Sequence, residues 1–397
     1  MPALDGRLAD AVSKDMAAYM GEVMSSVSFR GRAPGVHSVR TRQVLTRFGW
    51  TDVRYPYRVG SPEASDAFRA FGVVRKMTPA ASAAVSRLAV TLGSFAEASG
   101  TLALLGCGSV SASKVRSEAL AVGKDCLDAQ REPEADVRRY TDAQAKVPEG
   151  GRSVPRTLAA MADGTNVPCT KADTRGVAGR NGGEAGSRQL RVMSFSEHVA
   201  VTGKGAPVPI RGSFSYAVMR GDVGELTGML RVQGVSRGAG TAPRVQCVAD
   251  GEEGLEKAFR DAFPDAVFTN DFMHASGYLS ACCQALGIAD PAKEYRTCRG
   301  VMLRHGAGSA VDRIRRLYKD GLAKSEEARS ALDYLDRRRD NMRYGWLRKN
   351  GYYISSAHAE AAARILVARR CKQAGMHWRH ENAARVCALI AKLRSAA

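Results

Sequence analysis

Two short apolar runs, each ending in an aspartate followed by glycine, decide the fold of this chain: Leu158-Ala159-Ala160-Met161-Ala162-Asp163-Gly164 and Val245-Gln246-Cys247-Val248-Ala249-Asp250-Gly251. Apolar runs of this length that stop at a turn signal predict buried strands, each ending at its aspartate. A third acid, Glu360, begins an Ala-rich helix. Two strand-end carboxylates and one helical carboxylate can converge on a pair of Mg²⁺ ions, and such a pair activates water or a 3′-hydroxyl to attack a phosphodiester.

The charge balance indicates a polyanionic partner. The 397 residues, enough for two or three domains, carry 59 Lys and Arg against 40 Asp and Glu, a formal charge of +19. Residues 291–397 alone hold 24 basic and 10 acidic residues, a net charge of +14. A solvated basic surface would also account for the excess, but its size and localisation favour nucleic acid as the partner.

Membrane, secretory and disulfide classes are not indicated. No apolar run approaches the roughly 18 residues of a membrane span, and residues 1–14 lack the apolar core of a signal peptide. The nine cysteines are scattered without a C-x-x-C pair, which favours neither a zinc ribbon nor a disulfide framework. We therefore expect a cytoplasmic, nucleoid-associated protein without a membrane partner.

The first 125 residues have features typical of DNA-binding regions. β-rich runs on both sides of Phe48-Gly49-Trp50 predict a hairpin with alternating arginines, although many such hairpins bind nothing. Residues 79–123 predict three helices: Ser94 and Glu97 form a capping box, Ser111 caps the third helix, and Gly123 closes it. This layout is that of a helix-turn-helix with Lys114 and Arg116 in its first turns, or of an ordinary helical hairpin.

The remaining chain divides into a linker and an α/β core with a helical insertion. Residues 126–156 are charged and end in a Pro/Gly-rich stretch, which predicts a linker. Residues 157–285 alternate strands and helices, residues 286–350 are helical and basic, and residues 351–397 carry the Glu360 helix and a final amphipathic helix. We expect strands at residues 158–163, 188–195, 215–219, up to Asp250, and 266–271, with helices at 223–232, 254–263, 355–372 and 381–394.

Five motifs follow one another in this order: Asp163-Gly164-Thr165-Asn166-Val167-Pro168, Val248-Ala249-Asp250-Gly251, Phe263-Pro264-Asp265-Ala266, Asp271-Phe272-Met273-His274-Ala275 and Arg370-Cys371-Lys372-Gln373-Ala374-Gly375-Met376-His377-Trp378. Together they resemble the motifs of bacterial insertion-sequence DDE transposases of the Mutator-like branch. The most specific point of resemblance is the pair Asp271-x-x-His274. The acid spacing is similar too, with 86 residues between the first two acids and 109 before the third. The resemblance covers nearly the whole chain and implies an RNase H-like mixed sheet with an all-helical insertion.

The resemblance also implies roles for individual residues. Asp163, Asp250 and Glu360 would hold two Mg²⁺ or Mn²⁺ ions. Asp271 and His274 would lie beside them, with His274 orienting the scissile phosphate, bracing Asp271, or serving as a structural histidine. The side chains expected to contact DNA phosphates, or else to form a solvated helix face, are those of Arg369, Arg370 and Lys372; Trp378 would stack on a base or simply pack.

Two positions depart from the family pattern. The loop before the glutamate is usually Ile-Gly-Ser-Gly, and here it is Ile354-Ser355-Ser356-Ala357. The position seven residues past the glutamate is often basic, and here it is Val367. Because the glycines normally permit a tight approach of the loop to the site, their loss puts the activity of this copy in question.

The expected activity is transposition: metal-dependent cleavage at transposon ends, then attack of the 3′-hydroxyls on target DNA. The partner would be double-stranded DNA, namely terminal inverted repeats and target, bound by a homodimer or higher oligomer. An RNase H-like nuclease, or an inactive or domesticated copy that acts only as a DNA-binding protein, are the alternatives.

Overall fold

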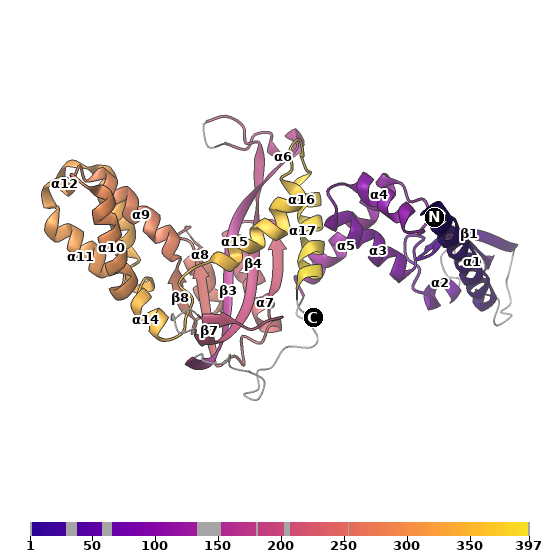
Figure 1. Ribbon diagram of the computed structural model, residues 1–397, viewed down its shortest axis with the longest axis horizontal. Helices are drawn as coiled ribbons and strands as arrows, with labels where there is room; N and C mark the ends of the chain where they lie inside the picture. The colour runs from indigo at the N-terminus through magenta and orange to yellow at the C-terminus, as the bar shows by residue number, and fades with distance from the viewer. Residues whose placement is uncertain are drawn as a thin grey trace. The chain divides into compact units, whose positions relative to one another are not determined.

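The computed structural model describes residues 2–28, 38–57, 66–132, 152–179, 182–201, 207–252 and 254–395. By its internal contacts the chain divides into two compact units, Met1–Asp125 and Cys126–Ala397. The second unit combines helices with a mixed sheet, so the chain is of the α/β class (Figure 1). Among the described helices, none has the length and apolar character required to cross a membrane.

The first unit is built on a hairpin and a long helix. Strands β1 (Ser38–Thr46) and β2 (Gly49–Tyr57) pair antiparallel around the predicted turn. Helix α1 (Pro2–Ser28) and the short α2 (Asp66–Ala70) lie against them. Every second residue from Thr51 to Tyr55 is buried in β2, which gives the hairpin the one-sided pattern that alternation predicts.

Three capped helices complete the first unit. Helices α3 (Pro79–Thr91), α4 (Phe95–Leu104) and α5 (Ala112–Ala129) follow the hairpin. Ser94 Oγ accepts from Glu97 N at 3.0 Å, while the Glu97 carboxylate accepts from Gly93 N at 2.9 Å. The prediction that Gly123 ends the third helix is wrong: Gly123 is buried inside α5, where glycine costs only about 1 kcal/mol relative to alanine.

The second unit contains a six-stranded sheet. The path of hydrogen-bonded neighbours is β5 (Pro207–Pro209), β4 (Ser187–Val201), β3 (Arg152–Pro168), β7 (Arg244–Ala249) and β8 (Val267–Asn270), and β6 (Ser215–Met219) pairs with β4. The pairs β3–β4, β4–β5 and β4–β6 are antiparallel, whereas β3–β7 and β7–β8 are parallel. β6 matches its predicted bounds, and β5 was not predicted.

The central strand is longer than predicted. β3 does not end at Asp163 but continues to Pro168, which pairs with Ser187 of β4. On its other side, however, the pairing of β3 with β7 extends only from Thr157 to Met161. Asp163 therefore lies in the middle of a strand but just past the end of its parallel pairing.

Helices cover both faces of this sheet. Leu158, Ala160 and Ala162 of β3 pack with α7 (Val223–Ser236) and α8 (Leu255–Ala262) in one core cluster. The alternate residues Ala159 and Met161 pack on the opposite face in a cluster that contains Ala359 of α15 (Ala357–Ala363). Figure 1 shows α15 lying across the strands of the sheet.

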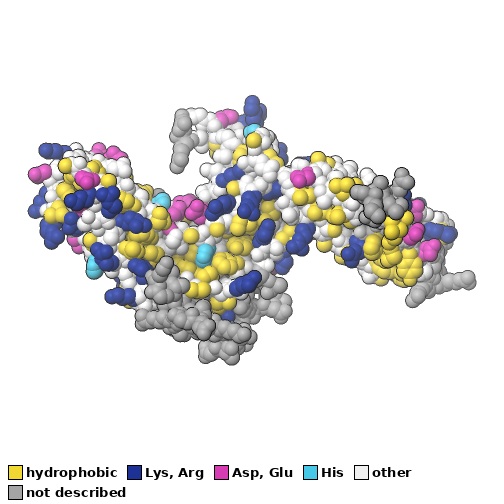
Figure 2. Space-filling model, viewed as in Figure 1, with side chains coloured by type: hydrophobic (Ala, Val, Ile, Leu, Met, Phe, Trp, Pro, Cys, Tyr) yellow, Lys and Arg dark blue, Asp and Glu magenta, His cyan; other side chains and the backbone are white. Residues whose placement is uncertain are grey.

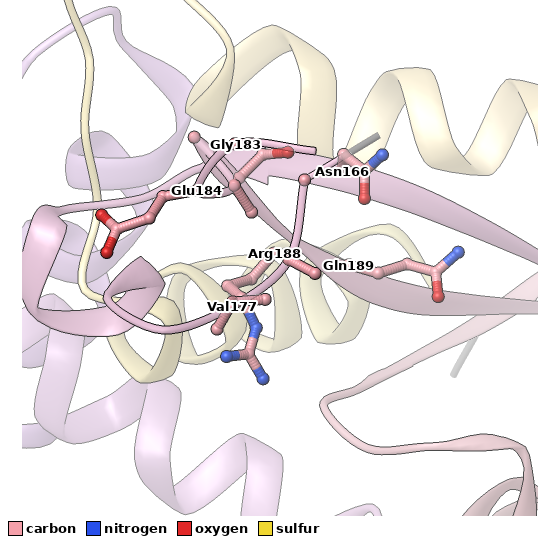
Figure 3. Close-up of a pocket in the computed structure, with 11 residues that line it drawn as sticks. Asn166, Val177, Gly183, Glu184, Arg188 and Gln189 are labelled. Carbon is pink, nitrogen blue, oxygen red and sulfur yellow. The ribbon is translucent and has the colours of Figure 1, made fainter. Parts of the chain in front are cut away.

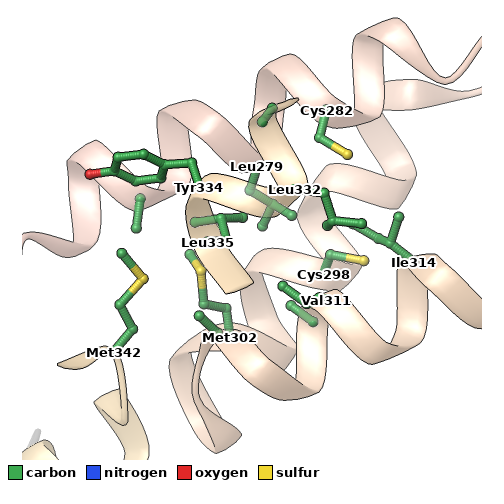
Figure 4. Close-up of a cluster of buried hydrophobic side chains, with 14 of the residues drawn as sticks. Leu279, Cys282, Cys298, Met302, Val311, Ile314, Leu332, Tyr334, Leu335 and Met342 are labelled. Atoms are coloured by element: carbon green, nitrogen blue, oxygen red, sulfur yellow. The ribbon is translucent and has the colours of Figure 1, made fainter. Parts of the chain in front are cut away.

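The segment between β8 and the C-terminal helices is helical and has its own core, as expected for residues 286–350. A cluster of buried side chains joins its helices to α9 (Phe272–Ala285), with Leu279, Met302, Val311 and Leu335 among its members (Figure 4). Its elements are α10 (Pro291–His305), α11 (Ala307–Leu317), α12 (Lys319–Lys324), α13 (Glu326–Arg337), the turn η2 (Arg339–Asn341) and α14 (Tyr344–Lys349).

The C-terminal helices return to the sheet. Helix α15 continues through a π-helical segment, Arg364–Ala368, into α16 (Arg369–Cys371), so the helix predicted for residues 355–372 is present but not regular. Helix α17 (His380–Arg394) packs against β6, and the backbone N–H of Tyr216 donates to Ser395 Oγ at 2.9 Å.

Candidate active site

Asp163 lies within β3, and Asp250 directly follows β7, the parallel neighbour of β3. In the β3–β7 pair every residue of β3 faces the residue 87 positions later, from Thr157 and Arg244 to Met161 and Val248. The same spacing separates Asp163 and Asp250, two residues beyond the last pair. Because side chains alternate between the two faces of a sheet, Asp163 lies on the face of Met161, which packs with Ala359 of α15.

Glu360 is brought to the same face by α15. Its neighbour Ala359 packs against Ala159, Met161 and Val248. The charges of Asp250 and Glu360 act on Asp163: burial first, and then the charge of Asp250, raise the pKa of the Asp163 carboxyl, and Glu252 and Glu360 add to the shift. The hydrogen bond from Gly164 N–H opposes it. Asp250 and Glu360 therefore both lie within electrostatic reach of Asp163.

The carboxylates do not form a closed ligand shell. Within the described ranges, no three His, Cys, Asp or Glu side chains are close enough to hold a metal ion. The donor set is nevertheless the one that Mg²⁺ prefers, carboxylate oxygens only. Burial first, and then the neighbouring acidic charges, raise the pKa of Asp163, and a divalent cation would offset both effects. Acidic side chains gather where the helical segment meets the sheet (Figure 2).

An ion pair with a buried arginine braces the turn that carries Asp250. Arg191 of β4, only 4% exposed, donates to both carboxylate oxygens of Glu252, at 2.9 and 2.6 Å. The backbone N–H of Glu252 in turn donates to Asp250 Oδ1 at 3.0 Å. Arg191 thus holds Glu252, and Glu252 orients the Asp250 carboxylate. Neither Arg191 nor Glu252 was among the predicted site residues.

Asp271 has a structural position beside the site. Its Oδ1 accepts from His274 N at 2.6 Å, which caps α9, and its Oδ2 accepts from Ser356 N at 2.7 Å and Ser356 Oγ at 3.1 Å. This carboxylate therefore holds the loop that leads to Glu360. Neither Ser355 nor Ala357 has a positive φ, so the chain passes through this loop without needing glycine there.

His274 lies against aromatic rings of the helical segment. Its ring centroid is 5.3 Å from that of Tyr278 and 6.1 Å from that of Tyr334, edge-on in both cases. The two tyrosines are stacked at 3.6 Å. The imidazole is exposed, so His274 is not the histidine buried under the strand that the structural alternative describes.

Of the three basic residues predicted past Glu360, Arg370 is buried, whereas Arg369 and Lys372 are exposed. Lys372 is exposed and its Nζ donates to Thr165 Oγ1 at 2.6 Å, two residues beyond Asp163 on β3. Arg369 is exposed as well. The expectation that Arg370 contacts a phosphate does not fit its position, because it is 3% exposed and packs over the ring of Trp378. Trp378 itself is buried, which matches the packing alternative.

An open groove of about 650 Å³ lies beside this end of β3 (Figure 3). It is formed by the Gly-rich connection between β3 and β4, with Asn166 and Gln189 extending to one side and Arg188 away from them. The amide of Gln189 crosses over Gly164: a Cβ there would lie 2.0 Å from Gln189 Nε2. The groove therefore continues the strand that carries Asp163.

In the first unit, Lys114 and Arg116 lie in the first turns of α5, as predicted. Arg116 is exposed and Lys114 is half-buried, and Ser111 Oγ accepts from Lys114 N at 3.2 Å, which caps the helix. Lys114 Nζ also donates to the backbone oxygen of Arg75 at 3.0 Å. Arg75 and Lys76 are the two described non-glycine residues with positive φ, and Glu118 holds the Arg75 guanidinium through two hydrogen bonds of 3.0 Å.

Comparison of the chain with known proteins identifies no family. No family model matches the chain, and no curated protein matches it.

Proposed function

We propose that this chain is a DDE transposase with an RNase H-like catalytic core, which binds transposon ends, cleaves DNA strands and transfers the 3′-hydroxyl ends to target DNA. The single observation that carries the proposal is the proximity of Asp250 and Glu360 to Asp163, whose carboxyl both charges influence. Asp163 lies in β3, Asp250 directly follows the parallel strand β7, and Glu360 is carried by α15, which packs against β3 and β4.

The strand order supports the RNase H-like core. Leaving aside the three-residue β5, the strands lie in the order β6-β4-β3-β7-β8, in which β4 alone runs opposite to the others; numbered by appearance, this order is 3-2-1-4-5. Three antiparallel strands followed by two parallel crossovers form the scaffold that the sequence pattern implied. The helical segment between β8 and α15 falls between the second and third acids, as in the proposed family.

The chemistry assigned to the site follows from its donors. Asp163, Asp250 and Glu360 would hold two Mg²⁺ or Mn²⁺ ions, which when bound activate the attacking hydroxyl and stabilise charge on the phosphorus centre. Arg191 and Glu252 orient the Asp250 carboxylate, and Asp271 holds the loop before Glu360. Lys372 places a cation beside the same end of β3, where a DNA phosphate would approach.

The first unit and the overall charge support DNA as the partner. A hairpin with exposed arginines and three capped helices with Lys114 and Arg116 on the surface form one compact unit. We propose that this unit recognises the terminal repeats and that two or more copies assemble on DNA. A fragment of residues 1–125 should bind a transposon-end duplex with an affinity that falls steeply with salt. Specific footprinting by the second unit alone would contradict this assignment.

Substitution of the three acids tests the catalytic proposal. Asp163→Asn, Asp250→Asn and Glu360→Gln should each abolish Mg²⁺-dependent end cleavage while duplex binding is retained, because the lost charges are metal ligands. Asp320→Asn, an exposed acid of α12, is the matched control and should cleave like the wild type. Substantial cleavage by any of the three variants would remove that residue from the site.

A strand-transfer assay separates the proposed transposase from its alternatives. A pre-cleaved end with a free 3′-hydroxyl should become joined to a target plasmid. Cleavage without joining would indicate an RNase H-like nuclease. Binding without either reaction would indicate a protein that only binds DNA.

A further inference from the structure

A second groove, of about 400 Å³, opens directly beside Asp250. One wall is the turn after β7 and the start of α8, and the other wall is contributed by Arg338, which follows α13 of the helical segment. The groove is distinct from the one lined by the β3–β4 connection, since the two share no residue. The helical segment therefore supplies a side chain to the immediate surroundings of a predicted catalytic acid.

Of the described charged side chains that line this groove, all but two form a salt bridge. Arg260 binds Glu256 at 2.8 Å and Lys257 binds Asp261 at 2.6 Å. Glu252 forms a salt bridge with Arg191 of β4 at 2.6 Å. Asp250 and Arg338 remain, and among the described residues neither of them forms a salt bridge. One carboxylate and one guanidinium thus face the same groove, and the part of the chain that the structure describes supplies no ionic partner for either.

Arg338 is held in place by stacking rather than by charge. Its guanidinium lies 4.1 Å from the ring centroid of Tyr334, which stacks on Tyr278 at 3.6 Å. One of its nitrogens donates to the Gly251 backbone oxygen at 3.4 Å. A stacked guanidinium keeps its other N–H groups in its own plane, where they can form two parallel hydrogen bonds to a phosphate.

Tyr334 fixes the distance between the helical segment and this turn. Its hydroxyl points out of the helical core (Figure 4) and is buried without a hydrogen-bond partner among the described residues. A Cβ at Gly251 would lie 1.4 Å from that hydroxyl oxygen, so only glycine admits so close an approach. The position of Arg338 relative to Asp250 is therefore set by packing.

We propose that this groove is a phosphodiester subsite and that Arg338 binds the DNA backbone phosphate next to the one being cleaved. The proposal rests on the proposed function, and it adds a contact residue from the helical segment to the predicted set. Arginine fits the task because its fork matches two phosphate oxygens, and Asp250 directly beside it marks where the reacting phosphate would lie.

Three consecutive arginines provide the test with its own control. Arg337 is exposed and donates only to the Asp333 backbone oxygen, whereas Arg338 lines the groove. Full-length wild type, Arg338→Gln and Arg337→Gln would be titrated into a labelled transposon-end duplex in Ca²⁺ buffer by fluorescence anisotropy, at several salt concentrations. Arg338→Gln should weaken binding about tenfold and reduce the slope of log K against log salt by about 0.9, the value for one lost phosphate contact. Arg337→Gln should change neither.

Arg338→Lys guards against a purely structural effect. Lysine keeps the charge and the aliphatic stem but not the planar fork, so this variant should retain the wild-type salt slope and lose part of the affinity. Equal affinities and slopes for Arg338→Gln and Arg337→Gln, with a wild type that binds, would overturn the subsite and leave the transposase proposal intact. A slope for Arg338→Lys equal to that of Arg338→Gln would also overturn it. A wild type that does not bind the duplex would overturn both proposals.

Discussion

The Asp271 carboxylate accepts the backbone N–H of Ser356 at 2.7 Å and the Ser356 hydroxyl at 3.1 Å, across 85 residues of chain. The same carboxylate caps α9 through His274 N. One side chain therefore joins the start of the helical segment to the loop that positions Glu360. This gives the Asp-x-x-His marker a physical purpose in the present chain: it ties the two ends of the helical segment together.

Removal of this carboxylate should affect stability and cleavage together. Asp271→Ala deletes a helix cap and leaves the Ser356 N–H without its acceptor, so we expect a loss of about 2 kcal/mol in the free energy of unfolding. Ser356→Ala removes only the hydroxyl contact and should cost about 1 kcal/mol. Urea denaturation measures both values, and end-cleavage rates should fall in the same order. A fully stable Asp271→Ala variant would contradict the bridging role.

The Arg191–Glu252 pair should contribute to stability through its buried arginine. Arg191→Met leaves Glu252, whose side chain is 32% exposed, without its partner and should destabilise the second unit by about 1–3 kcal/mol. The double variant Arg191→Met/Glu252→Met removes both charges and should recover most of that loss in a urea titration. Cleavage should stay low in the double variant, because the Glu252 turn no longer positions Asp250. Wild-type cleavage by the stable double variant would show that the pair serves stability alone.

Asp163 should make the metal-free protein less stable at neutral pH. Burial and the neighbouring charges raise its pKa in the folded state, so between the usual carboxyl pKa and the raised value the folded state binds more protons than the unfolded state. Stability is therefore lost as the pH rises through this window. In EDTA, Asp163→Asn should unfold about 2–4 °C above the wild type at pH 7, the shift that ~1 kcal/mol gives for a domain of this size.

The pH dependence is the control for this prediction. The difference in melting temperature between Asp163→Asn and wild type should shrink as the pH is lowered towards 4, because the wild-type carboxyl then becomes neutral. A constant difference across this range would mean that the aspartate charge is not the cause.

Gly251 should be intolerant of any side chain. The Cβ of Gly251→Ala would overlap the Tyr334 hydroxyl, and overpacking of this kind costs about 1–3 kcal/mol. Gly277→Ala in α9 is the control: it meets nothing within 4 Å and should be neutral or stabilising by up to ~1 kcal/mol. In a double-mutant cycle measured by urea denaturation, Tyr334→Leu should reduce the cost of Gly251→Ala. If the two substitutions change the free energy of unfolding in a strictly additive way, then no steric contact couples Gly251 and Tyr334.

The sequence predicted an element well where its structure depends on residues that are close together along the chain. β6 has its predicted bounds, and the Ser94 and Ser111 caps are present, because alternation and capping depend on neighbours along the chain. The end of the strand at Asp163 was misplaced for the opposite reason. An Asp-Gly pair signals a turn, but here β4 supplies a partner for five more residues.

The sequence predicted the three acids of the candidate site but not the residues that hold one of them in place. Arg191 and Glu252 are 61 residues apart and meet only through the order of the strands, which no local pattern contains. The acidic residue after Asp250-Gly251 was the available signal for Glu252. Arg370 was misplaced because the π-helical segment inserts extra residues per turn after α15, and each extra residue rotates the following side chains by about 100°.

The unequal pairing of β3 gives the candidate site one fixed and one adjustable side. Asp163 stands on backbone that β4 holds for five further residue pairs, up to Pro168. Asp250 stands past the end of β7 on a turn that no strand pairing holds, braced by Glu252 and Arg191 and by the hydrogen bond from Arg338 to the Gly251 oxygen. We therefore expect a change in the separation of the two carboxylates to come from the turn. The fold thus places the adaptable carboxylate next to the helical segment and keeps the other as the reference point.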